Sequence, residues 1–125
     1  MMSFLKSLFA GSPRLAPAEA VRMVGDGAAI IADVREDAEL RSTGKAKGAL
    51  HLPLSALPQA GDPGSGRFER KLNPALEAGL PVIVYCASGG RSEQAARVLR
   101  AQGFATVHNL GGLRDWVAGG GMVQK

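Results

Sequence analysis

The single cysteine of this chain, Cys86, lies in the segment CASGGRS, between the apolar run PVIVY and the sequence EQAARVLRAQGF. The thiolate is the nucleophilic form of cysteine, and positively charged surroundings stabilise it. Gly89 and Gly90 permit a tight turn in which backbone N–H groups from Ala87 to Ser92 point toward the sulfur. The start of a helix directly after this turn adds positive potential. The segment is typical of a reactive thiolate inside an anion-binding loop.

Arg91 lies five positions after Cys86, and two uses for it are open. Its guanidinium group can neutralise a bound anion, or it can brace the loop by pairing with an acid such as Asp33. The spacing also bears on the chemistry. Cysteine phosphatases carry this arginine one position farther along, in a wider loop that surrounds a phosphoryl group, whereas a tighter loop suits a single outer sulfur atom. The spacing therefore favours sulfur transfer over phosphate-ester cleavage or arsenate reduction.

A free cysteine that ends an apolar strand is more often a small buried hydrophobe than a nucleophile. The two glycines, the arginine and the helix start are costly features that a buried filler does not require, so we favour the nucleophile. His51 and His108 fall in expected strands without clustered carboxylates, and we predict neither a metal site nor acid–base work for them. We expect no cofactor and no metal, and we expect Trp116 to be a core anchor.

The composition is typical of one soluble domain. The chain has 125 residues, 46% apolar and 21% charged, which suffices for a single hydrophobic core. The net charge is +4, but lysines and arginines alternate with acids along the chain, so we expect no nucleic-acid partner. One cysteine excludes an intramolecular disulfide framework and fits a reducing compartment. The expected location is the cytoplasm.

Strands and helices alternate along the sequence. Apolar runs predict strands over residues 28–34 and 81–86 and in the segments ALHLPL and ATVHNL, while helical patterns cover residues 17–24, 92–102 and the short segment LRDWV. The turn residues GDPGSG predict a loop before the third strand. This alternation favours an α/β fold with a parallel sheet covered on both faces. Ligands of such sheets bind at the carboxyl ends of the strands, where Cys86 lies.

The first thirteen residues form a separate feature, an amphipathic extension over residues 1–13 that precedes a domain over residues 14–125. Apolar side chains at helical spacing, Phe4, Leu5, Leu8 and Phe9, predict a short amphipathic helix. It is too short to span a membrane, which takes about twenty apolar residues. We favour packing on its own domain over docking on a partner or on a membrane surface.

Four segments together resemble a known family. DVRE (Asp33 to Glu36), GKAKGALHLPLSAL, VIVYCASGGRS with its following helix, and NLGGLRDW (Asn109 to Trp116) are similar to the rhodanese homology domain of single-domain sulfurtransferases, over residues 14 to 118. The resemblance implies a three-layer fold whose central, mainly parallel sheet has five strands, with helices on both faces. It implies that Cys86 is a persulfide-forming nucleophile. It gives the substrate-binding loop as Ala87, Ser88, Gly89, Gly90, Arg91 and Ser92. From the residues themselves we add Asp33 and Arg35 as supporting residues, Asp33 as a candidate partner of Arg91 and Arg35 as a brace of its turn.

The implied reaction moves a sulfane sulfur from thiosulfate or a persulfide donor to an acceptor through a Cys86 persulfide. No second cysteine resolves this intermediate, so the acceptor is an external thiol, cyanide or a protein. Ala87 stands where many thiosulfate-using relatives have a basic residue, which makes thiosulfate a weaker fit. Lys45 and Lys47 replace a histidine and a proline of the family turn, and we expect them to be solvated. The alternatives are a non-catalytic binding module of the same fold and, less favoured, a phosphatase or arsenate reductase.

Overall fold

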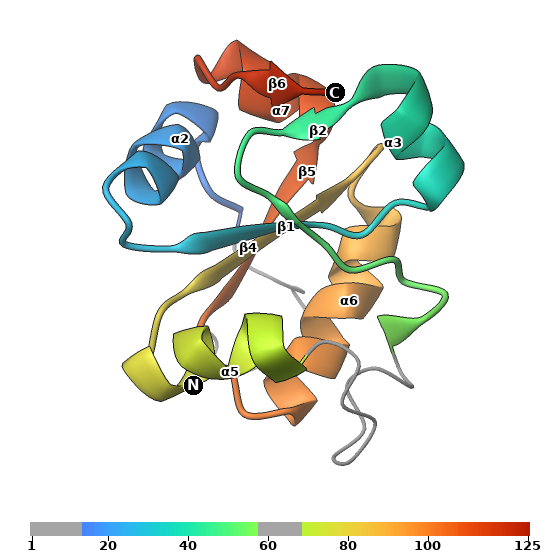
Figure 1. Ribbon diagram of the computed structural model, residues 1–125. Helices are drawn as coiled ribbons and strands as arrows, with labels where there is room; N and C mark the ends of the chain where they lie inside the picture. The colour runs from blue at the N-terminus through green and yellow to red at the C-terminus, as the bar shows by residue number, and fades with distance from the viewer. Residues whose placement is uncertain (1–13, 58–68) are drawn as a thin grey trace, which may run out of the picture.

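The computed structural model describes residues 14–57 and 69–125, and its centre is a four-stranded parallel sheet (Figure 1). The strand order is β3-β1-β4-β5. The bounds are β1 Ile30–Asp33, β3 Leu50–His51, β4 Val82–Cys86 and β5 Val107–Gly112. Every neighbouring pair in this sheet is parallel, as strand–helix–strand connections require. The predicted α/β class is confirmed.

Helices cover both faces of the sheet (Figure 1). α2 and α7 lie on one face, and α5 and α6 lie on the other. The bounds are α2 Pro17–Gly25, α3 Asp37–Thr43, α5 Glu69–Ala78, α6 Gly90–Ala101 and α7 Leu113–Ala118. The short helix α3 follows β1 directly, so it lies at the carboxyl edge of the sheet, where Cys86 ends β4.

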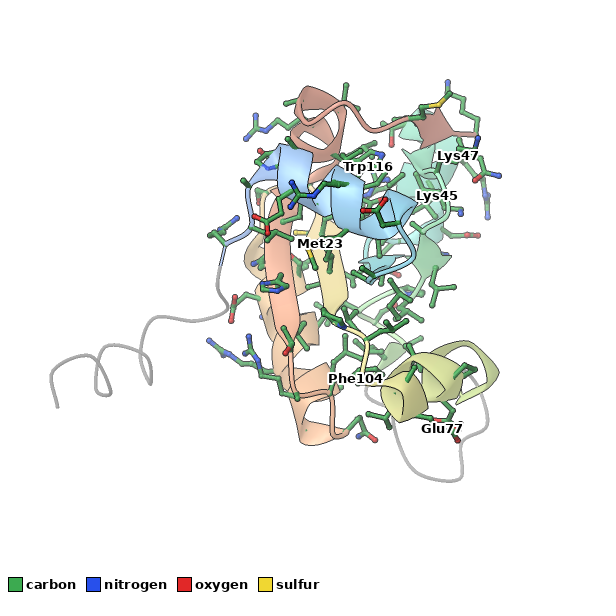
Figure 2. All side chains as sticks on the ribbon, turned by 90° about the vertical axis from the view of Figure 1, so that its left-hand side faces the viewer. Met23, Lys45, Lys47, Glu77, Phe104 and Trp116 are labelled. Atoms are coloured by element: carbon green, nitrogen blue, oxygen red, sulfur yellow. The ribbon has the colours of Figure 1, made fainter. Side chains whose placement is uncertain are left out.

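The alternation of side chains along each strand divides the core into two clusters. Along β4, Val82, Val84 and Cys86 pack on the side of α5 and α6, whereas Ile83 and Tyr85 pack on the side of α2 and α7. Figure 2 shows the two ends of this arrangement, with Phe104 beside α5 and with Met23 and Trp116 around α2. Each cluster fixes one face of the sheet, and the Cys86 side chain belongs to the face covered by α6.

The prediction of five strands in the central sheet is wrong for the described residues, in which this sheet has four. At the outer side of β5, Arg14 makes one isolated parallel bridge to Asn109, and the described chain then continues into the helix that begins at Pro17. β2 Lys45–Ala46 instead pairs antiparallel with β6 Val123–Gln124 in a separate two-stranded sheet. The strand expected in ALHLPL shortens to Leu50–His51, since Pro53 has no N–H to donate to a ladder.

Two predicted features lie outside the described residues. These are the amphipathic segment over residues 1–13 and the GDPGSG loop, residues 61–66. None of the helices within residues 14–57 and 69–125 combines the length and the apolar character that a bilayer crossing requires.

Candidate active site around Cys86

The Cys86 side chain lies below the surface of the loop that joins β4 to α6. β4 ends at Cys86, and α6 begins at Gly90. Cys86 is 1% exposed, whereas Ala87 and Ser88, which follow it, are exposed. A reactant therefore meets the rim of the loop before it reaches the sulfur.

Hydrogen-bond donors surround the sulfur. The backbone N–H of Gly89 donates to Cys86 Sγ at 2.9 Å, and Ser92 Oγ lies 3.4 Å from the same atom. Burial raises the pKa of the Cys86 thiol, but hydrogen bonds from the Ser92 side chain and from the N–H groups of Ser92, Gly89 and Ser88 outweigh it. The pKa of Cys86 consequently lies below its usual value. The amino end of α6 points at the same sulfur and favours its negative charge.

The conformation of Gly89 makes this arrangement possible. Gly89 caps α6 with φ +106°, a left-handed conformation that residues with a side chain rarely adopt. A Cβ on Gly89 would also lie 3.0 Å from Nη2 of Arg14. Gly90 has an ordinary φ and open space around it, so the turn requires only the first of the two glycines.

Asn109 anchors the loop from β5, and the sequence did not identify it as a site residue. Asn109 is 1% exposed and donates from Nδ2 to the Gly89 carbonyl at 2.9 Å. Its Oδ1 accepts from the Ser92 hydroxyl at 2.7 Å and from the Gly111 N–H at 3.0 Å. The β4–β5 register slips after this residue, because Val84 pairs with Asn109 and Tyr85 pairs with Gly111. Bulges of this kind often lie next to active sites, where they change the direction in which a side chain points.

Gly112 brings the start of α7 against the loop. A Cβ at this position would collide with the Ala87 carbonyl oxygen. The Gly112 N–H donates to Asp115 Oδ2 at 2.9 Å, which caps α7. The GG pair of the segment NLGGLRDW thus lets β5 and α7 approach the cysteine loop closely.

Arg91 braces the loop by pairing with Glu39. Nη1 and Nη2 of Arg91 donate to the two carboxylate oxygens of Glu39 at 2.6 and 2.9 Å. Of the two uses left open for Arg91, the structure shows pairing with an acid. That acid is Glu39 and not Asp33, the example considered from the sequence, and strand alternation gives the reason. Asp33 is in register with Tyr85, whose side chain points to the α2 and α7 face, whereas Cys86 points to the other face.

Asp33 and Arg35 instead form a buried pair with each other. Nη2 and Nε of Arg35 lie 2.7 and 3.0 Å from the carboxylate of Asp33, whose exposure is 0%. Arg35 also donates to Thr43 Oγ1 and to the Gly44 carbonyl, which ties both ends of α3 together. The hydrogen bond to Asp33 raises the pKa of Arg35. The pair holds α3, the helix that carries Glu39, at the edge of the site.

The histidine, lysine and tryptophan side chains considered in the sequence lie outside the cysteine loop, and three of them make hydrogen bonds to backbone carbonyl groups. His51 Nε2 lies 2.7 Å from the Arg35 carbonyl oxygen, and no group of His, Cys, Asp and Glu within the described residues is arranged to hold a metal. Lys45 donates to the Ala49 carbonyl at 2.7 Å instead of being solvated as expected, while Lys47 is exposed (Figure 2). Trp116 is 3% exposed and donates to the Met122 carbonyl, as expected of a core anchor.

Known proteins resemble this chain. Residues 16–119 match the family model of the rhodanese-like domain. The putative sulfur carrier protein YrkF of Bacillus subtilis is 37% identical over 87 residues, 69% of this chain, and the match spans only 40% of that protein. The thiosulfate:glutathione sulfurtransferase of Saccharomyces cerevisiae is 31% identical over 80% of this chain and 74% of its own. The human single-domain sulfurtransferase TSTD1 superposes with a TM-score of 0.70 at 28% identity, over 86% of this chain and 97% of its own.

Proposed function

Since the chain belongs to the rhodanese-like domain family, we propose that it is a sulfurtransferase in which a Cys86 persulfide carries the sulfur. The observation that carries the proposal is the position of Cys86 Sγ, 2.9 Å from the Gly89 N–H at the amino end of α6. This environment lowers the pKa of the thiol, so a larger fraction of it is the nucleophilic thiolate at neutral pH.

In the first half-reaction the Cys86 thiolate attacks the outer sulfur of a sulfane-sulfur donor. With thiosulfate, the S–S bond of the donor breaks, its electron pair leaves with sulfite, and a Cys86 persulfide forms. No proton is transferred and the total charge is unchanged. The negative charge on the outer sulfur of the persulfide faces the N–H groups of the loop, and hydrogen bonds to a charged acceptor contribute about 1.5–3 kcal/mol each.

In the second half-reaction an external nucleophile attacks the outer sulfur. An acceptor thiolate leaves as a persulfide and cyanide leaves as thiocyanate, and either product regenerates the Cys86 thiolate. The acceptor comes from outside the chain because Cys86 is its single cysteine. A reducing cytoplasm supplies such thiols, in agreement with a site that uses a free cysteine.

Phosphate-ester cleavage fits the loop less well. A phosphatase loop directs its arginine at the bound phosphoryl group. In this chain, Nη1 and Nη2 of Arg91 instead donate to the carboxylate of Glu39. A non-catalytic binding module would not require donors around a sulfur that is 1% exposed.

The test is a donor–acceptor assay with thiosulfate or a low-molecular-weight persulfide as donor and cyanide as acceptor. Thiocyanate release by the wild type, abolished in Cys86→Ser, is the expected result. Release of phosphate from an aryl phosphate, abolished by the same substitution, would replace the proposal with phosphatase chemistry. An unreactive thiol in a folded, reduced sample would leave the binding module in its place.

A further inference from the structure

Glu39 holds Arg91 with both of its oxygens at the rim of the cysteine loop. The bidentate geometry, with N···O distances of 2.6 and 2.9 Å, is the strongest form of a carboxylate–guanidinium pair. Glu39 Oε1 also accepts the Glu36 N–H at 3.1 Å in the capping box of α3, so the carboxylate is fixed from its own helix. Arg91 lies in the first turn of α6, whose amino end faces the Cys86 sulfur. The hydrogen bonds to Glu39 raise the pKa of Arg91, and the charges of Glu39 and Cys86 raise it further.

Other charged side chains of both signs lie around the loop among the described residues. Glu36 adds a second carboxylate near Arg91, and the Ser55 hydroxyl holds it at 2.7 Å. On the β5 side, the Arg14 guanidinium lies near Gly89 and Gly111. The Asp115 carboxylate also lies near Gly111, since a Cβ added to this glycine would be 2.7 Å from Asp115 Oδ2 and 3.0 Å from Arg14 Nη1. Position 87, directly after the cysteine, is an alanine.

We propose that Glu39 is a positioning residue that sets donor specificity. By holding the Arg91 guanidinium it withdraws this cation from the donor, and the site takes sulfane sulfur from monoanionic or uncharged donors in preference to dianionic thiosulfate. The inference rests on the proposed persulfide chemistry and adds the class of donor to it. A dianion gains more than a monoanion from a nearby unpaired cation, so the pairing penalises thiosulfate selectively.

Two donors that transfer sulfur in the same way isolate the charge. Thiosulfate carries two negative charges and releases sulfite, whereas methanethiosulfonate carries one and releases methanesulfinate. In both reactions the thiolate attacks the outer sulfur, and the electron pair of the broken S–S bond leaves with the oxidised sulfur group. The rate constant of Cys86 persulfide formation is measured for each donor by intact mass, and the ratio of thiosulfate to methanethiosulfonate is the readout.

Glu39→Gln is the test variant, because glutamine keeps one oxygen for the capping box, removes the charge and replaces the other acceptor by an NH2 group, which breaks the two-point contact to Arg91. The expected ratio rises about threefold to tenfold at low salt and returns toward the wild-type value as salt screens the freed cation. The matched control is Asp37→Asn, which removes the same charge from the same helix, where Asp37 pairs with Arg41 in solvent. It is expected to leave the ratio unchanged.

A double variant, Glu39→Gln with Arg91→Gln, removes both partners and keeps the net charge of the wild type. The inference predicts that its ratio equals that of the wild type, and a ratio clearly below it would mean that Arg91 already serves thiosulfate. An unchanged ratio in Glu39→Gln, with both donors loading Cys86, overturns the inference and leaves the proposed function intact. No loading of the wild type by either donor overturns the proposed function and this inference with it.

Discussion

The Ser92 hydroxyl lies 2.7 Å from Asn109 Oδ1 and 3.4 Å from the Cys86 sulfur, but it has one proton to donate. The orientation of the Asn109 amide is fixed, because Nδ2 faces the Gly89 carbonyl and Oδ1 faces the Gly111 N–H. We therefore expect the hydroxyl to donate to Asn109 when Cys86 is a thiol and to turn to the sulfur when Cys86 is a thiolate. Ser92 links the ionisation of the nucleophile to the loop anchor.

Ser92→Ala is expected to raise the pKa of Cys86 toward the ordinary thiol value of about 8.5, because the thiolate loses one donor and keeps its backbone donors. The measurement is the pH dependence of Cys86 alkylation by iodoacetamide. Ser88→Ala is the control, since Ser88 acts on the sulfur through its backbone N–H, which the substitution keeps. Equal midpoints for Ser92→Ala and the wild type would contradict this role of the hydroxyl.

Asn109→Ala is expected to lower the free energy of unfolding by about 1–3 kcal/mol, because buried groups of Gly89, Gly111 and Ser92 lose their partner. Urea denaturation measures the loss. The same variant is expected to slow persulfide formation in the protein that remains folded, since the loop carbonyl at Gly89 is no longer held. His108→Leu is the comparison in the neighbouring position, because the buried His108 Nδ1 has no hydrogen-bond partner among residues 14–57 and 69–125. Equal stability of Asn109→Ala and the wild type would show that the anchor is dispensable.

Arg35→Lys tests whether the Asp33–Arg35 pair supports the fold and takes no part in the chemistry. Lysine cannot make the forked contact to Asp33 or reach Thr43 and Gly44 at the same time, so we expect unfolding to become easier by about 1–3 kcal/mol. Persulfide formation by the folded fraction is expected to stay within about twofold of the wild type, since these side chains lie away from Cys86. Arg41→Lys, in an exposed pair, is the control and is expected to change the stability by less than about 0.5 kcal/mol. A selective loss of sulfur loading would give Arg35 a direct role.

The Glu39–Arg91 pair makes a pH-dependent contribution to stability. Hydrogen bonds from Arg91 lower the pKa of Glu39 to about 2. Because the folded value lies below the unfolded value of about 4.3, the contribution is complete above about pH 4.3 and is lost as the pH falls toward 2. Both side chains are about one-third exposed, so solvent screening limits it to about 1 kcal/mol.

Glu39→Gln is therefore expected to be less stable than the wild type at neutral pH, with the difference shrinking as the pH falls below about 4.3. Urea denaturation of both proteins over this range measures it, with Asp37→Asn again as the control for charge. A constant difference across the range would mean that the pair does not titrate as the structure indicates.

The segment from Cys86 to Ser92 was predictable because its determinants are local. An apolar strand, a glycine at the left-handed position and a helix start follow one another within the chain, and each leaves a sequence signal. The partner of Arg91 left no such signal. Whether Asp33 or Glu39 faces the loop depends on the register between β1 and β4 and on the place of α3, and both are set by tertiary packing.

Other features were hidden for related reasons. Asn109 stands in an otherwise apolar strand before two glycines, a pattern that a search for buried polar residues would have found. β6 has only two residues, Val123–Gln124, and pairs with β2 across most of the chain length, so no local pattern marks it. α5 contains Pro74 and comes shortly after the glycine-rich sequence GDPGSG, which weakens its helical signal.

Persulfide formation on Cys86 is tested most directly by the intact mass of the reduced protein after brief incubation with thiosulfate, methanethiosulfonate or a low-molecular-weight persulfide. We expect a gain of one sulfur atom in the wild type, none in Cys86→Ser, and a return to the original mass after cyanide or dithiothreitol. A folded, reduced wild type that gains no sulfur from any of these donors would contradict this expectation.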